Sequence, residues 1–199
     1  MSQLKVNSII PRSGVPVGAS GGGIVQVVST RKTDRFTTSS TSFVDITNFQ
    51  VTITPLSTSN KILLMCCFGQ AGTRQNTLDH GNAIRVLKNG SIDNNLNADA
   101  DGTRPRHCYK GVGWSFNTDH MPGGVGFCGL DDPSTTSALT YKVQVQCQSS
   151  SYAFHMNRPP DNGNGTNIYE NATVSHLIAM EVAGWRVQEM DGIEELQQH

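Results

Sequence analysis

The stretch Thr140-Tyr-Lys-Val-Gln-Val-Gln-Cys147 decides the fold class. Apolar side chains occupy alternate positions in it, with polar ones between them: Tyr141, Val143, Val145 and Cys147. Because successive side chains of a β-strand point to opposite faces, this period of two predicts a strand with one buried and one solvated face.

Similar segments recur on both sides of this one. Residues 61–68 are almost continuously apolar, which predicts a central strand. Other strands are expected at residues 24–28, at 43–46 continuing through 49–53, and at 84–87, 111–116, 125–130, 152–156 and 174–182. Residues 55–60 are expected to form a turn, and Asn89-Gly90 is a tight-turn signal. Eight or nine strands without helical patterns between them predict an all-β fold, an antiparallel β-sandwich or jelly roll.

The composition agrees with this fold class. Gly, Thr, Ser and Asn supply 71 of the 199 residues, and only 16% of the residues are charged. Helical bundles and coiled coils are instead dominated by Ala, Glu, Lys, Leu and Arg. A short helix is expected only at residues 186–198, where Gly192 weakens it.

Charge and hydropathy exclude several partners. Fifteen basic and sixteen acidic residues give a net charge of -1 and are scattered, so no basic stripe is available for a nucleic-acid backbone. The longest apolar run, residues 62–68, is far shorter than a membrane span. The first residues also lack the pattern of a signal peptide. We therefore expect neither nucleic-acid binding nor membrane insertion nor export.

Three parts are expected along the chain. Residues 1–28 read as an arm and Gly-rich hinge, residues 29–183 as the β-sandwich domain, and residues 184–199 as a C-terminal extension. The arm has too few apolar residues for a core of its own, so its apolar side chains should pack on another copy of the chain or on another protein. Long loops are expected at residues 69–82, 92–110 and 157–171.

The cysteines do not suggest disulfides. They are five in number, and the adjacent Cys66 and Cys67 would point to opposite faces of a strand. Small buried apolar side chains in a reducing compartment are the expected role.

Motifs that suggest catalysis or metal binding lack their structural context. Residues 18–22 match GxSxG and residues 124–129 match GxGxxG, but no helix is expected to follow either segment. The six histidines show no metal-ligand spacing, although a symmetric oligomer could gather one from each chain. Residues 99–102 place two carboxylates close together without a complete calcium loop. We expect no catalytic residue, metal or cofactor.

Exposed aromatic side chains on loops are the remaining candidates for binding, because they stack on sugar rings. These are Tyr109, Trp114, Phe116, Tyr152 and Tyr169. Trp114 and Phe116 lie two positions apart and fit one face of a core strand better.

Several segments in this order resemble the C-terminal domains of fibre proteins from tailed bacteriophages, especially marine and cyanobacterial ones. The resemblance is carried by residues 37–48, 51–65 and 129–146, by Asn157-Arg158, by residues 175–182 and by the opening residues 4–14. The loop at 92–110 and the tail beyond Val182 depart from that pattern.

The resemblance implies a homotrimeric, non-enzymatic virion appendage, assembled in the host cytoplasm. Its N-terminal part would attach to tail or baseplate proteins through Leu4, Val6, Ile9 and Ile10. Its β domain would contact a host-surface glycan, for which the candidate residues are Tyr109, Trp114, His120, Arg158 and Tyr169. One alternative is a purely structural virion component, such as a head-decoration, baseplate or collar protein. A third hypothesis is an enzyme that cleaves capsular saccharide with two carboxylates.

Overall fold

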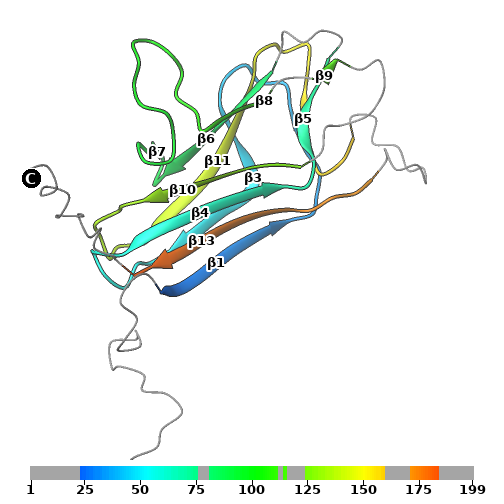
Figure 1. Cartoon of the computed structure of the whole chain (residues 1–199). Helices are drawn as coiled ribbons and strands as arrows, with labels where there is room; N and C mark the ends of the chain where they lie inside the picture. The colour runs from blue at the N-terminus through cyan, green and yellow to red at the C-terminus, as the bar shows by residue number, and fades with distance from the viewer. Residues whose placement is uncertain (1–22, 76–80, 112–113, 116–123, 160–170, 184–199) are drawn as a thin grey trace, which may run out of the picture.

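The computed structural model describes residues 23–75, 81–111, 114–115, 124–159 and 171–183. These residues contain thirteen β-strands and no helix (Figure 1). The strands are β1 (Ile24–Lys32), β2 (Phe36–Thr38), β3 (Val44–Ile53), β4 (Lys61–Phe68), β5 (Ala71–Gln75), β6 (Asn82–Lys88), β7 (Ser91–Ile92), β8 (Tyr109–Gly111), β9 (Trp114–Ser115), β10 (Val125–Asp131), β11 (Leu139–Cys147), β12 (Phe154–Met156) and β13 (Ser175–Val182).

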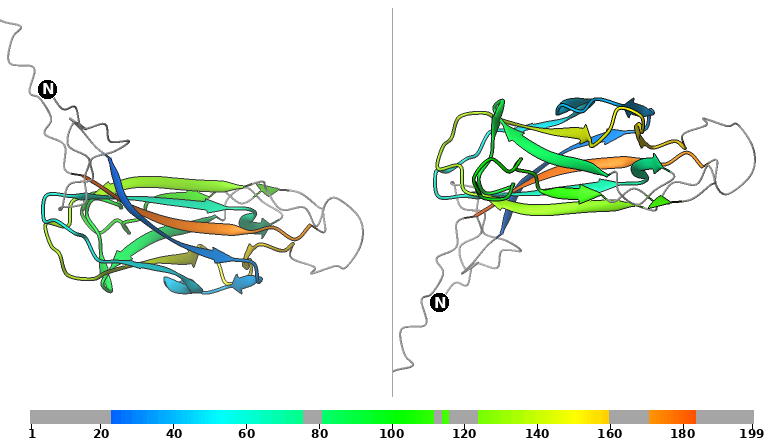
Figure 2. Two further views of the ribbon diagram at one scale, coloured as in Figure 1. Left: turned by 90° about the horizontal axis from the view of Figure 1, so that it is seen from below. Right: turned by 90° about the horizontal axis from the view of Figure 1, so that it is seen from above.

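Two antiparallel sheets form the two layers of the molecule, as both views in Figure 2 show. The first sheet has the strand order β1-β13-β4-β10, and the second has the order β3-β11-β6-β7, with β8 also paired to β6. A third, smaller sheet has the order β2-β12-β5-β9, and its β5–β9 pair is parallel. The predicted all-β, mainly antiparallel architecture is therefore confirmed.

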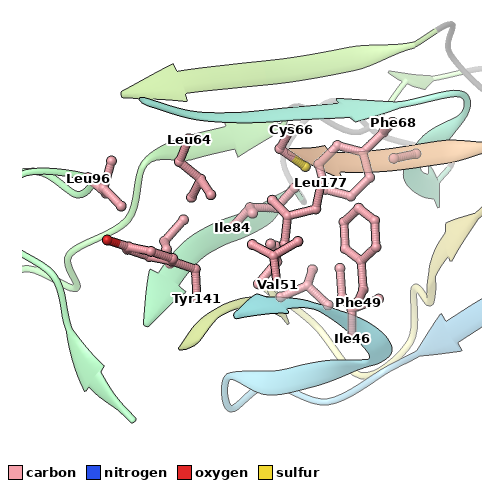
Figure 3. Close-up of a cluster of buried hydrophobic side chains, with 14 of the residues drawn as sticks. Ile46, Phe49, Val51, Leu64, Cys66, Phe68, Ile84, Leu96, Tyr141 and Leu177 are labelled. Carbon is pink, nitrogen blue, oxygen red and sulfur yellow. The ribbon is translucent and has the colours of Figure 1, made fainter. Parts of the chain in front are cut away.

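The core lies between the two larger sheets (Figure 3). The first sheet contributes Leu64, Cys66 and Leu177, and the second contributes Val51 and Tyr141, among other side chains. In β11 the residues alternate between buried and half-buried, as its period of two predicts. The central position of residues 61–68 is also confirmed, since β4 lies between β13 and β10.

The expected tight turn joins β6 to β7. Asn89 and Gly90 both have positive φ, 50° and 85°, and Lys88 pairs with Ser91 across them. Positive φ at both central residues matches the twist of the flanking strands, and glycine adopts it without strain.

Short strands that depend on distant partners were missed or misplaced. Residues 69–82 are not one loop, because β5 lies within them and pairs with β12. The single strand expected at 111–116 is instead β8 and β9, which belong to different sheets. β2, for which no strand was expected, pairs with β12. Strands this short have little local pattern and form because a partner distant in sequence supplies their hydrogen bonds.

One long side of the sandwich is closed by side chains of β1. Three of them donate hydrogen bonds to backbone carbonyls of β3 or of the residue that follows it: Gln26 Nε2 to Thr54 O at 2.8 Å, Thr30 Oγ1 to Gln50 O at 2.5 Å, and Lys32 Nζ to Thr47 O at 2.9 Å. These bonds tie the two sheets together where β1 and β3 are both edge strands.

The buried side chain of Asn157 links three residues near the C-terminal end of β1. Its side-chain amide donates to Lys32 O at 2.9 Å and to Asp34 O at 3.1 Å, while its Oδ1 accepts from Ser175 Oγ at 2.6 Å. The residue is fully buried with φ of 66°, a conformation that asparagine tolerates better than most residues. Asn157 thus has a structural role, because its side chain holds the residues at the end of β1 next to the start of β13.

The expected arm and C-terminal extension fall only partly within the described residues. Residues 24–28, which sequence reasoning placed at the end of the arm, belong to β1. The anchor candidates Leu4, Val6, Ile9 and Ile10, the GxSxG match at 18–22, and the helix and extension expected at 184–199 lie outside the described residues.

Candidate functional site

The residues proposed to bind a glycan are not gathered into one described site. Tyr109 lies in β8, half-buried and packed against the core, and not on an exposed loop. Arg158 follows β12 and donates from Nη1 to the backbone oxygen of Asn157 at 2.7 Å. Trp114 is in β9, of which the backbone alone is described; His120 and Tyr169 lie outside the described residues. Tyr109 and Arg158 are therefore associated with different sheets.

The segments whose sequences suggested a phosphate or metal site can also be located in the structure. Val125 to Gly129 of the GxGxxG match lie within β10, which is a strand and not a phosphate-binding turn. Asp101 is exposed and pairs with Arg104 at 2.9 Å. Among the side chains that the structure describes, no three of His, Cys, Asp or Glu gather as metal ligands would. No helix in the same residues could span a membrane.

The most distinctive surface is the side of the β1-β13-β4-β10 sheet that faces away from the core, here called the outer face. Alternation along each strand fixes its members, because Ile62, Leu64 and Leu177 point inward and are buried. The outer face is formed by Val27, Ser29, Leu63, Met65, Cys67, Gly126, Cys128, Leu130, Ile178 and Met180.

Strand register arranges these side chains in rows across the sheet. In one row Val27 pairs with Met180, Met180 with Leu63, and Leu63 with Leu130. The next row runs Ser29, Ile178, Met65 and Cys128. Val27 is 53% and Leu130 is 41% exposed, and Leu63 and Met180 between them are half-buried, so apolar side chains form an uninterrupted band over four strands.

Charged groups stand only at the two ends of this band. Lys61, at one end, forms an ion pair with Asp132. Arg31 and His176, a cross-strand pair, lie at the other end, beside Cys67. The two rows between these ends therefore carry no ionisable group except the thiol of Cys128.

The opposite surface of the sandwich has a contrasting character. On the second sheet Asp45 accepts from Gln144 Nε2 at 2.6 Å and from Lys142 Nζ at 3.2 Å. Arg85 donates from Nε to Gln144 at 2.7 Å and stacks on the Phe43 ring. This polar network suits a surface in water. The other sheet instead presents a band of exposed and half-buried apolar side chains, a kind of surface that is common at protein–protein contacts.

A second cluster of ionisable groups lies under the segment that follows β7. Lys88 Nζ contacts Asp131 Oδ1 at 2.8 Å and Asp93 Oδ2 at 2.6 Å. Asp131, which has no exposed side-chain surface, also accepts from Tyr141 OH at 2.6 Å and Asn95 Nδ2 at 2.8 Å. Every group in the cluster thus has a partner.

The electrostatics of this cluster argue against acid–base catalysis. Burial alone would raise the pKa of Asp131, but hydrogen bonds from Lys88, Tyr141 and Asn95 outweigh it and lower that pKa. Burial and the neighbouring Asp131 raise the pKa of Tyr141. The aspartate is held charged and the phenol neutral, whereas a general acid or base needs a pKa near the working pH. We assign the cluster a structural role, holding residues 93–97 against β6 and β10.

Sequence reasoning did not identify the outer face. The sequence did contain a signal for this surface, because residues 61–68 are almost continuously apolar. A strand that is apolar on both sides has two faces to bury. The Lys88 cluster had no local signal, because its members lie in β6, β10, β11 and the segment after β7.

Comparison with known proteins does not identify a family or a function for this chain. No family model matches the chain, and no curated protein matches it significantly.

Proposed function

We propose that this chain is a non-enzymatic structural protein of a bacteriophage virion, a homotrimeric tail fibre or short spike. The observation that supports assembly is the uncharged apolar band of the outer face, centred on Leu63, Met65, Ile178 and Met180. Its N-terminal residues attach to tail or baseplate proteins, and its β domain meets the host surface at a glycan. The phage assignment itself rests on the sequence resemblance.

The strand order supports a jelly roll as the finer description of the sandwich. The first strand of the described chain, β1, lies beside the last, β13, and β3 lies beside β11. Such interleaving of early and late strands in two facing sheets is the jelly-roll arrangement, which viral capsid and lectin domains share. Fold alone does not establish function, so this likeness only agrees with the proposal.

Trimer formation would remove this apolar surface from water. Each large apolar side chain removed from water contributes roughly 1 kcal/mol or more, so a band of six such side chains favours association. Three copies also hold three weak glycan sites together, which raises the effective concentration at a cell surface.

The assembly step is tested by light scattering on three proteins. We expect the wild-type chain to be a trimer, the outer-face variant Met65→Lys to be a monomer, and the matched variant Gln144→Lys on the polar sheet to remain a trimer. A monomeric wild-type chain at micromolar concentration would overturn the assembly step.

Host attachment is tested with the labelled trimer and host cells. Binding that falls after periodate oxidation of the cell-surface glycans supports a glycan receptor, and binding that survives oxidation contradicts it. Deletion of residues 1–20 should abolish binding to the purified tail or baseplate partner; unchanged binding would refute the anchor.

A purely structural virion component, at the head, baseplate or collar, is the second candidate. One observation favours it: Tyr109 packs against the core and Arg158 is bound to the backbone of Asn157, so neither is presented freely to a receptor. Antibody labelling of whole particles separates the two, since a fibre is labelled at the tail and a decoration protein at the head.

A further inference from the structure

The first sheet ends in two edge strands, β10 and β1, and the register of β1 has a bulge between Ile24 and Gln26. In the described part of the chain β10 pairs only with β4, and β1 pairs only with β13. Residues 125–130 of β10 contain neither charge nor proline, and the β10–β4 register runs without a bulge. Natural proteins usually block an exposed edge with one of these devices, because an open edge pairs with other strands.

We propose that three copies close their β1-β13-β4-β10 sheets into a triangular prism, in which β10 of each copy pairs with β1 of the next and the outer faces point inward. This inference rests on the proposed trimer and specifies its interface. The occupant of the outer face is thus the same face of two sister chains.

Strand direction permits this closure. Each neighbouring pair in the sheet is antiparallel, so over four strands β1 and β10 run in opposite directions. Rotation about an axis along the strands preserves direction, and therefore β10 of one copy is antiparallel to β1 of the next. The contact joins two different edges, which is the heterologous type of interface that closes a ring of three.

The dimensions also agree. At a strand spacing of about 4.8 Å, a four-stranded sheet is roughly 19 Å wide, and a triangle with such sides places each sheet about 5.5 Å from the axis. Half of the usual distance between packed sheets is about 5 Å. The Leu, Ile and Met side chains of three outer faces would consequently fill the prism.

The charges fit the same arrangement. Lys61 and Asp132 lie at one end of the outer face, and Arg31 and His176 lie at the other. In the prism these groups surround the two open ends, where water reaches them, while the uncharged rows lie in the middle. Burial of an unpaired charge, which would oppose assembly, is thereby avoided.

Disulfide cross-linking of the full chain tests the arrangement. The native Cys128 on β10 is kept, Cys67→Ser removes the other exposed thiol, and one cysteine is placed on β1 as Val27→Cys, Ser29→Cys or Arg31→Cys in turn. Mild oxidation should give covalent trimers on a non-reducing gel for at least one position. The control Gln144→Cys, on the polar sheet, should give none.

The possible outcomes separate this inference from the proposed function. Covalent trimers that disappear with Cys128→Ser support the prism. A particle that is trimeric by light scattering but yields only covalent dimers, or no cross-link at any β1 position, overturns the prism and leaves the trimer standing. A wild-type chain that is not a trimer refutes the proposed assembly, and the prism with it.

Discussion

Lys88 and Asp131 form an ion pair with 2.8 Å between Nζ and Oδ1, and the carboxylate has no exposure to solvent. The pair joins β6 to β10, which belong to different sheets. It therefore connects the two layers at the side of the sandwich away from β1 and β3. Asp93 shares the same ammonium group, which fixes the segment after β7 to this connection.

Asp131→Asn should lower the free energy of unfolding by roughly 2 kcal/mol, because the charged acceptor of the hydrogen bonds from Lys88, Tyr141 and Asn95 is lost. Urea unfolding followed by fluorescence measures the loss. The neighbouring substitution Asp132→Asn removes a half-exposed ion pair with Lys61 and should cost less than about 1 kcal/mol. Equal losses for the two variants would refute the structural role of the Lys88 cluster.

Acid should remove the contribution of Asp131 in a defined direction. Its folded-state pKa is lowered, so the carboxylate stabilises the fold above the unfolded pKa of about 3.9 and loses this effect as the pH falls through the lower folded value. Urea midpoints from pH 7 to pH 2.5 should therefore fall less steeply below pH 4 for Asp131→Asn than for the wild type. Parallel curves would contradict this prediction.

Asn157→Gly keeps a residue that adopts positive φ easily but removes the side-chain amide. The carbonyls of Lys32 and Asp34 lose their donor, and Ser175 Oγ loses an acceptor. We expect a loss of about 2–3 kcal/mol in unfolding free energy. The matched control is Asn48→Gly, at an exposed residue with φ of 57°, which should change stability by less than about 0.5 kcal/mol.

Two adjacent leucines should respond differently to truncation. Leu64 is fully buried in the core, whereas Leu63 lies on the outer face. In the monomeric Met65→Lys background, Leu64→Ala should cost about 3 kcal/mol in unfolding free energy and Leu63→Ala less than about 1 kcal/mol. In the wild-type background, Leu63→Ala should instead raise the dissociation constant of the proposed trimer, which sedimentation at decreasing concentration measures.

Thiol labelling provides an independent test of which face is covered. Burial raises the pKa of the Cys66 thiol, and that of Cys108 to about 12, so these two should react slowly in any state. Cys67 and Cys128 are exposed in the single chain. Both should react with a maleimide within minutes in the Met65→Lys variant, which we expect to be a monomer, and at least tenfold more slowly in the proposed wild-type trimer. Similar rates in the two proteins would place the covered surface elsewhere.

The sequence predicted long strands well and short ones poorly. β11 and β13 have enough residues for their pattern to be recognised, and the Asn89-Gly90 turn has its own local chemistry. β2 and β5 were not predicted, because their hydrogen bonds come from a strand distant in the chain. Of the glycan candidates, Tyr109 was expected on a loop and lies in β8, since pairing with β6 orders it.

By itself, the sequence determined that the chain forms β-strands, because alternation, turn residues and composition act within a few residues of one another. It could not determine which side of residues 61–68 faces the core. Ile62 and Leu64 are no more apolar than Leu63 and Met65, so the local pattern gives both faces an equal claim to burial. Only the tertiary structure decided: the second sheet packs on one face, and the other is left with an apolar surface that water does not favour.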